Sequence, residues 1–244
     1  MAVYYNKDIR WYVGAMSVAC HAKSATLSSS CEALDTTALC DDGWVELIGG
    51  NKSGTFDMSL MSDVADDGLD ERLWSYLGVA DTPQSFSIGS ADGSPGYTMK
   101  SLSTQYVPVA GPPGGLAMAS LSGTSSGAIA RGMLIHPDTT ARTSSGTGTA
   151  WQVGALSSSQ RLYAGLHVIS ASGTTPTLAV KVQSDTVGFG SATDRITFST
   201  ATDVANREQF SSVAGAITDD YWRVSYTIGG TTPSFQFAVI VGIG

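Results

Sequence analysis

The stretch that decides the fold runs from Leu39 to Gly78 and reads LCDDGWVELIGGNKSGTFDMSLMSDVADDGLDERLWSYLG. Residues 43–48 are apolar enough for a strand, and the Gly- and Asn-rich residues 49–54 favour a turn because both residue types tolerate positive φ. Residues 55–60 then alternate between apolar and polar side chains. This order predicts a hairpin with one face exposed to water.

A helix is expected directly after this hairpin, over about residues 63–77. Ser62 or Asp63 is the expected N-cap, and acidic residues in the first turn suit the positive end of the helix dipole. Gly78 stands where a left-handed residue commonly ends a helix. The helical spacing brings four side chains to one face: Leu69, Leu73, Tyr76 and Leu77.

Length and composition indicate a single, mainly β domain. The chain has 244 residues, 28 of them Gly, and only 14% are charged, while its later apolar runs are too short for helices. The formal net charge is −8, which argues against a surface that binds nucleic acid, because that affinity comes from Lys and Arg. Any contact with DNA should therefore be non-adhesive.

The charges are divided unevenly along the chain. Ten of the 21 acids lie in residues 41–81 with only two cations, whereas residues 100–181 contain five cations and the single acid Asp138. This division suits head-to-tail contacts in which a negative patch of one copy meets a positive patch of the next. Two solvated faces of opposite charge are the alternative interpretation.

The cysteines and the apolar runs indicate reduced thiols and no membrane insertion. Cys20, Cys31 and Cys40 are odd in number and lack a CxxC spacing, so neither a disulfide framework nor a zinc site is expected. No run approaches the roughly 18 apolar residues of a membrane span. We expect no metal and no cofactor.

Short strands joined by turns fill the rest of the chain. Residues 22–30 show no clear periodicity and indicate an extended arm or an irregular strand. The expected strands after the helix are 84–88, 97–109, 116–121, 128–135, 161–170, 178–183, 195–198, 221–226 and 234–243. Strands without intervening helices predict a sandwich or barrel, and no internal repeat is apparent.

One motif raises an enzymatic alternative. Gly123-Thr124-Ser125-Ser126-Gly127 matches the GxSxG pattern of hydrolases, in which Ser125 would be the nucleophile. That elbow needs a helix after the serine, whereas residues 128–135 are typical of a strand. The three histidines lie far apart in the sequence, so a metal site or a catalytic triad is not indicated. The chain is not expected to be an enzyme.

The order of elements resembles the major tail tube proteins of long-tailed, siphophage-type bacteriophages. Four segments carry the resemblance: the aromatic strand Arg10 to Val18, the run Glu32 to Leu39 leading into Asp41-Asp42-Gly43-Trp44, the hairpin with the acidic helix ending Leu73-Trp74-Ser75-Tyr76-Leu77-Gly78, and the strand Arg131-Gly132-Met133-Leu134. These motifs are diffuse, but together they span most of the chain.

The resemblance implies a structural virion protein of the phage tail, assembled in the host cytoplasm. Its fold would be an antiparallel β-sandwich or barrel subunit with one flanking helix, and hexameric rings would stack around a continuous inner β-barrel. The tape measure protein and the tail terminator and distal tail proteins would be its partners. Genome DNA would pass through the tube without tight binding.

Two acids are candidates for the lumen of such a tube. Glu46 and Asp57 lie on the strands of the expected hairpin, which we assign to the inner barrel. Residues 1–244 are expected to form one tail-tube domain. An extended N-terminal arm over residues 1–10 and a C-terminal sub-region over residues 151–244 are left open.

A different class of function is a decoration protein or a carbohydrate- or receptor-binding β-sandwich module. Trp151, Trp222 and Tyr226 could stack on sugars if their rings were exposed. The alternation of residues 221–226 places Trp222 and Tyr226 with Val224 on one face, which favours a buried core instead.

Overall fold

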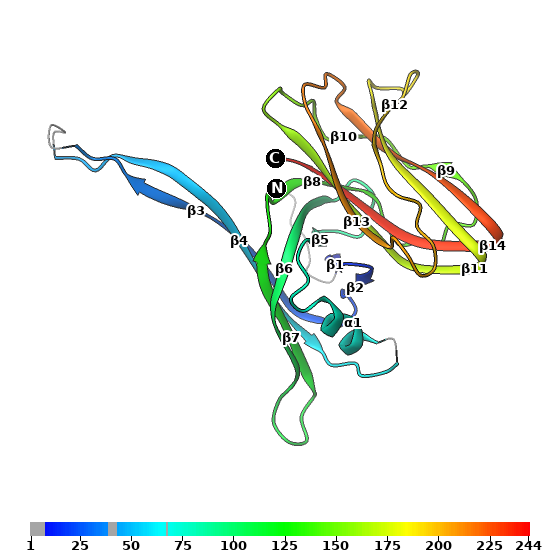
Figure 1. Cartoon of the computed structure of the whole chain (residues 1–244), viewed down its shortest axis with the longest axis horizontal. Helices are drawn as coiled ribbons and strands as arrows, with labels where there is room; N and C mark the ends of the chain where they lie inside the picture. Colours follow the sequence, from blue (N-terminus) through cyan, green and yellow to red (C-terminus); the bar gives the residue numbers. More distant parts are fainter. Residues whose placement is uncertain (1–7, 39–42, 67) are drawn as a thin grey trace.

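The computed structural model describes residues 8–38, 43–66 and 68–244 and is mainly β, as predicted (Figure 1). Its one described helix is α1 (Leu69–Tyr76). The strands of the N-terminal half are β1 (Arg10–Val13), β2 (Met16–Ser17), β3 (Ala22–Asp35), β4 (Leu47–Met61), β5 (Thr82–Ser87), β6 (Pro95–Ala110) and β7 (Met118–Ser125). Those that follow are β8 (Ala130–His136), β9 (Gly146–Thr147), β10 (Trp151–Gln152), β11 (Arg161–Asp185), β12 (Thr193–Thr197), β13 (Glu208–Ala214) and β14 (Tyr221–Ile243).

The N-terminal half is built around the antiparallel strand order β3-β4-β7-β6. Even-numbered residues of β4 and odd-numbered residues of β7 point to the same side, where they pack beneath α1 and β1. The largest side chains of this core are Trp11, Phe56, Leu60, Leu73 and Leu121. One face of the sheet is therefore buried, and the other is free.

The hairpin differs from its prediction. We expected a turn over residues 49–54, but these residues lie inside β4, which pairs with β3 from Ala22↔Leu60 to Asp35↔Leu47. Glycine adopts ordinary extended backbone within a strand when a partner strand supplies the hydrogen bonds. These glycines therefore form no turn. The irregular segment expected over residues 22–30 is part of the long strand β3.

The helix is also shorter than its prediction over residues 63–77. It begins at Leu69, because Gly68 has extended backbone (φ −80°, ψ −168°), and the Asp63 side chain accepts a hydrogen bond from the Ala65 amide before the helix starts. The predicted C-terminus is confirmed, since Gly78 follows the helix with a φ of +77°. Leu69 and Leu73 are the buried residues of the expected face.

One bent two-stranded ribbon builds the C-terminal half. β11 and β14 pair antiparallel from Leu162↔Ile243 to Asp185↔Tyr221, so each of them joins two of the predicted strands into one (Figure 1). Leu166 and Val180, from opposite halves of β11, belong to the same buried cluster. The ribbon therefore folds over its own core, and the two halves of each strand lie on opposite sides of it.

A repeated tetrapeptide makes the bend. Residues 173–176 and 230–233 both read Gly-Thr-Thr-Pro, a repeat absent from our sequence-based expectations. In both copies the Gly and the second Thr have positive φ, at 119° and 47° in β11 and at 111° and 47° in β14. A Cβ on either glycine would lie within 3 Å of the other copy's backbone. Close backbone approach thus explains why glycine stands at both positions.

β8 joins the two halves of the molecule. It pairs with β6 on one side and with β14 on the other, so the N-terminal sheet continues by hydrogen bonds into the C-terminal ribbon. A small third core and a polar layer lie at this junction, where Tyr12 stacks on His167 at 5.2 Å. The two halves have separate main cores but are not joined by a flexible linker.

Within the described residues, no helix has the length and apolar character needed to cross a membrane.

Candidate assembly surfaces

The free face of the N-terminal sheet is covered with hydroxyl side chains. Strand register places the following residues on it: Ser24, Thr26, Ser28 and Ser30 of β3; Ser53, Thr55, Asp57, Ser59 and Met61 of β4; Met118, Ser120, Ser122 and Thr124 of β7; and Leu102, Gln105 and Val107 of β6. We call this set the hydroxyl face. Asp57 is its single charged member, in register with Thr26 and Ser122.

Small uncharged hydroxyl groups give this face an unusual character. It presents none of the Lys and Arg that bind phosphate. Its apolar members Met61, Leu102, Val107 and Met118 are only partly exposed. Ser30 and Ser53 hydrogen bond to each other across the strands at 2.9 Å, so some of their capacity is used within the sheet. Its one charged member is an acid, so the residues of this face offer no cation to a phosphate group.

The same sheet ends in two unpaired edges. β3 has 14 residues and pairs only with β4 among the described strands. On the opposite side, β6 beyond Ser103 pairs with β7 alone, because its outer edge is last used where the Gly78 amide donates to the Ser103 carbonyl at 3.0 Å. Long unprotected edges of this kind are templates for pairing with another chain.

α1 lies next to the β6 edge. The Tyr106 hydroxyl of β6 donates to the Asp70 carboxylate of α1 at 2.8 Å, and Leu77 forms a bridge with Ser103. Burial, followed by the Asp70 hydrogen bond and charge, raises the pKa of Tyr106. The helix is therefore fixed beside the edge that a neighbouring strand would occupy.

The β3–β4 hairpin projects far from the rest of the molecule (Figure 1). Fourteen residues of β3 span roughly 46 Å at about 3.3 Å per residue, and most of its outer half is exposed. Several large apolar side chains near its end have no cover in a single copy: Leu34, Trp44, Val45, Leu47 and Ile48. Exposed apolar groups at the end of such a projection mark an interaction site.

The structure places the two candidate lumen acids differently. Asp57 lies in β4 on the hydroxyl face, as the hairpin assignment required. Glu46 precedes β4 and lies in the connection at the hairpin end, where its amide donates to the Thr37 hydroxyl at 3.0 Å. The expectation that Glu46 belongs to a strand is wrong by one position, because β4 begins at Leu47. The Glu46 carbonyl still accepts a hydrogen bond from the Thr36 amide at 2.9 Å. A lumen position for either acid stays a prediction.

The residues considered for sugar binding or catalysis lie in the core or in strands where the structure describes them. Trp222 and Tyr226 are buried in the C-terminal core, as the alternation predicted, so they offer no platform for sugars. Ser125 ends β7 and is followed by β8 after a short loop, so the strand-to-helix elbow of hydrolases is not formed. His136 and His167 are both buried within sheets. Cys40, Asp41 and Asp42 lie outside the described residues.

Sequence reasoning missed the two edges and the hydroxyl face. β3 carries Ser and Thr on one side with Ala25 and Leu27 on the other, which is a weak alternation in small residues. Counting hydroxyl residues at every second position in β3 and β7 could have found the face. The edges depend on strand order, which the local sequence does not encode.

No protein-family model matches the chain, and no curated protein matches it. Among solved structures, it is similar to a chain from the virion of a native gene transfer agent particle, with 24% identity over 53% of this chain and 98% of that chain and a TM-score of 0.45. A chain from the tail of an empty gene transfer agent particle, described with C6 symmetry, has 21% identity over 52% and 97% and a TM-score of 0.43. The SPP1 tail tube has 10% identity over 55% and 81% and a TM-score of 0.44. By their own descriptions, these three chains come from a virion, a tail and a tail tube.

Proposed function

We propose that this chain is the structural subunit of a phage-type tail tube. Copies join edge to edge into a hexameric ring, rings stack into a hollow tube, and genome DNA travels down the tube. The observation that carries the proposal is one sheet with two unpaired edges and a hydroxyl-covered free face. The resemblance of the sequence to tail tube proteins supports the ring and the stacking.

Strand direction supports closure of a ring. β3, β4, β7 and β6 alternate in direction, so β3 of one copy set beside β6 of the next continues the same antiparallel pattern. The contact joins two different edges and is therefore heterologous, which produces a ring when the rotation closes. Closure would leave no free edge in the barrel.

The size of such a barrel suits a duct. Four strands from each of six copies, spaced about 4.8 Å apart, give a circumference of roughly 115 Å and a backbone diameter of roughly 37 Å. Strand tilt would widen it further. With the hydroxyl face inward, the wall would carry one Asp57 per copy and none of the cations that displace counterions from DNA. DNA would slide rather than bind.

The partners follow from the same role. A tape measure protein would fill the tube during assembly, and terminator and distal tail proteins would close its two ends. The chain would be located in the virion tail after assembly in the host cytoplasm. The role is structural, and no chemistry or cofactor is assigned to it.

Electron microscopy of the purified protein tests the proposal. Negatively stained samples at several protein and salt concentrations should show six-fold rings or hollow tubes that increase with concentration. Dispersed particles that never associate at high concentration would overturn it.

A matched pair of variants tests the edge contact itself. Thr104 lies in the bulge of β6 between Ser103 and Gln105, outside the β6–β7 ladder, and it is exposed. Thr104→Pro constrains the backbone of β6 where its outer edge is unpaired, whereas Thr104→Ala removes only the hydroxyl. We expect both variants to keep a thermal unfolding midpoint near that of the parent, and only Thr104→Pro to lose assembly. Equal assembly of the two would contradict pairing at this edge.

A further inference from the structure

The end of the β3–β4 hairpin has the composition of a docking segment. Trp44 is 82% exposed, which is extreme for a tryptophan in a folded chain. Residues 31–51 contain five acids and no cation, so the apolar side chains are surrounded by negative charge. Among the described acids, Glu32, Asp35 and Glu46 are all exposed. An aromatic anchor with acidic neighbours requires an apolar pocket beside cations.

One pocket of the same chain has the complementary character. A cavity of about 460 Å³ opens between β13 and the loop that joins β7 to β8, and it is lined by Lys100, Gly127, Ala128, Tyr163, Phe210, Ser211 and Ser212. We call it the β13 pocket. The rings of Tyr163 and Phe210 lie 5.8 Å apart and form its apolar wall. Both side chains are only partly buried, so they are available for contact.

Cations surround the β13 pocket. Arg161 is exposed and donates two hydrogen bonds to the Ser212 hydroxyl, at 3.0 and 3.3 Å. Within the described residues it has no carboxylate partner. Lys100 forms an ion pair with Asp81 at 2.9 Å, and both side chains remain exposed. Arg161 thus leaves the rim of the pocket net positive.

A second pocket is less suitable. It has about 450 Å³ between α1 and the residues before β13, and its lining includes Arg72, Asn206, Arg207 and Glu208. Its one aromatic residue, Tyr76, donates its hydroxyl to the Glu208 carboxylate at 2.9 Å. This lining is mainly polar, and the Tyr76 hydroxyl is already hydrogen-bonded, so it provides little apolar surface for a tryptophan ring. The β13 pocket is therefore the better acceptor.

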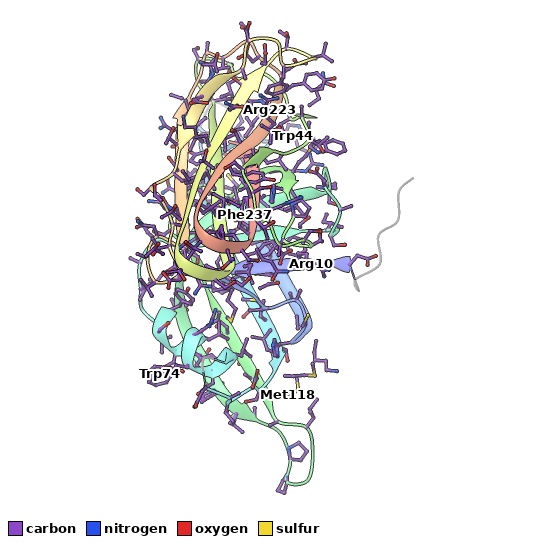
Figure 2. The ribbon with its side chains drawn as sticks, turned by 90° about the vertical axis from the view of Figure 1, so that its right-hand side faces the viewer. Arg10, Trp44, Trp74, Met118, Arg223 and Phe237 are labelled. Carbon is purple, nitrogen blue, oxygen red and sulfur yellow. The ribbon has the colours of Figure 1, made fainter. Side chains whose placement is uncertain are left out.

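We propose that the end of the β3–β4 hairpin, with Trp44 as its anchor, docks into the β13 pocket of a second copy. The hairpin of a single copy points away from its own β13, so the contact is between copies (Figure 1). In Figure 2 the labels of Trp44 and Arg223 lie close together only because the hairpin stands behind the C-terminal half in that view, whereas Figure 1 draws the hairpin end far from that half. The exposed acids Glu32, Asp35 and Glu46 then meet Arg161, which gives a physical use to the uneven charge distribution.

This inference rests on the proposed self-assembly and adds its acceptor site. Residues 29–35 of β3 lie beyond the part of the hairpin that pairs with β7 and span roughly 23 Å at about 3.3 Å per residue. This projection links copies that the edge contact alone does not join. The contact is heterologous, since the donor hairpin and the acceptor pocket are different surfaces. Each copy gives one hairpin and receives another.

Cysteine cross-linking tests the contact directly. In a background where Cys20, Cys31 and Cys40 are serine, Val45→Cys marks the hairpin end beside Trp44, and Ser211→Cys marks the β13 pocket. Mild oxidation of a mixture of the two variants should give disulfide-linked dimers. The matched control is Val187→Cys, at a side chain that is 75% exposed on the far loop of the C-terminal half. It should not cross-link to Val45→Cys.

The anchor is tested in the same assay. Adding Trp44→Ala to Val45→Cys should reduce the cross-linked yield roughly tenfold, as expected when an interface anchor is truncated. Assembly of the cysteine-free parent is followed by microscopy in parallel. If that parent forms tubes but Val45→Cys links equally to Ser211→Cys and Val187→Cys, the docking site is wrong and the tube proposal stands. If the parent neither assembles nor cross-links, both are overturned.

Discussion

His167 is a buried titratable residue with hydrogen-bond partners on both ring nitrogens. Its Nδ1 lies 2.7 Å from the Gly14 carbonyl and its Nε2 lies 2.8 Å from the Ser85 hydroxyl, so the neutral ring donates to one and accepts from the other. Its burial is complete, and this desolvation lowers its pKa from 6.5 to about 4. The residue connects the C-terminal ribbon to the N-terminal sheet only while it is neutral.

The pH dependence of stability follows from that shift. Because the folded pKa lies below the unfolded value of 6.5, the contribution of His167 is fully present above pH 6.5 and is lost as the pH falls toward 4. The loss is on the order of 3 kcal/mol. Chemical unfolding measured at several pH values between 7 and 4 should show this decline.

His136 is a second buried histidine whose titration must be separated from that of His167. Burial also lowers its pKa to about 4, so it contributes a second decline over the same range. His167→Gln keeps a hydrogen-bonding side chain that does not titrate, and we expect it to remove about half of the slope. An unchanged slope in this variant would show that His167 does not control the acid response.

Gly78 allows a second prediction at the residue scale, about the stability of a helix end. Its φ of +77° follows α1, and an Ala there would meet no other atom within 4 Å, so any cost comes from the backbone alone. Gly78→Ala should lower the free energy of unfolding by roughly 1–2 kcal/mol. Gly190→Ala is the control, because Gly190 has ordinary φ and open space around it. Equal midpoints for the two variants in thermal unfolding would refute the assignment.

At the scale of elements, β8 is the strand that the two halves share. Gly132 lies in β8 opposite Gly242, and a Cβ there would meet the Val241 carbonyl and the Gly242 Cα. Only glycine allows β8 and β14 to approach this closely. A Cβ on Gly242 would likewise meet the Ala130 backbone, so the joint between the halves depends on glycine at both paired positions.

Gly132→Ala should weaken that joint. Backbone atoms cannot move aside as a side chain can, so we expect a loss of about 1–3 kcal/mol in the free energy of unfolding. Limited proteolysis should then cut near residues 126–130 faster than in the parent. Gly190→Ala again serves as the control, and equal cleavage of the two variants would argue against a joint at β8.

Elements with weak local signals were the ones that sequence reasoning missed. Residues 22–30 were expected to form an extended arm or an irregular strand because they show no clear periodicity, but pairing with β4 makes them part of a 14-residue strand. β11 and β14 were each divided at Gly-Thr-Thr-Pro, whose residues break most strands. Here the two breakers stand side by side, and the irregularities compensate each other across the ribbon.

At the scale of the whole molecule, substitutions of Asp57 test whether the hydroxyl face lines the lumen of a tube. In assembled tubes, Asp57→Lys would place one cation per copy on the hydroxyl face, and such tubes should retain duplex DNA at low salt and release it as salt rises. Parent tubes should retain none. Asp57→Asn is the matched control, since it removes the acid without adding a cation.

Co-sedimentation of labelled DNA with tubes measures this difference. A steep salt dependence for Asp57→Lys alone is the expected result. Retention by none of the three proteins would place Asp57 away from the path of DNA and would count against the hydroxyl face as the wall.

The sequence by itself determined what depends on local pattern and composition. It predicted a mainly β chain, the end of the helix at Gly78, the burial of Trp222 and Tyr226 and the position of Asp57 in a strand. Each of these follows from side-chain periodicity or from the backbone freedom of one residue. The uneven distribution of charge was likewise present in the sequence.

Tertiary structure decided the rest, because strand order and edge exposure depend on pairs of residues far apart in the chain. Glu46 lies just before β4, and the partner of β4 is β3 rather than the residues on the other side of the expected turn. The hydroxyl face exists only where β3, β4 and β7 align in register. The β13 pocket brings Lys100 next to Phe210, a proximity that no local pattern encodes, since packing of the two halves creates it.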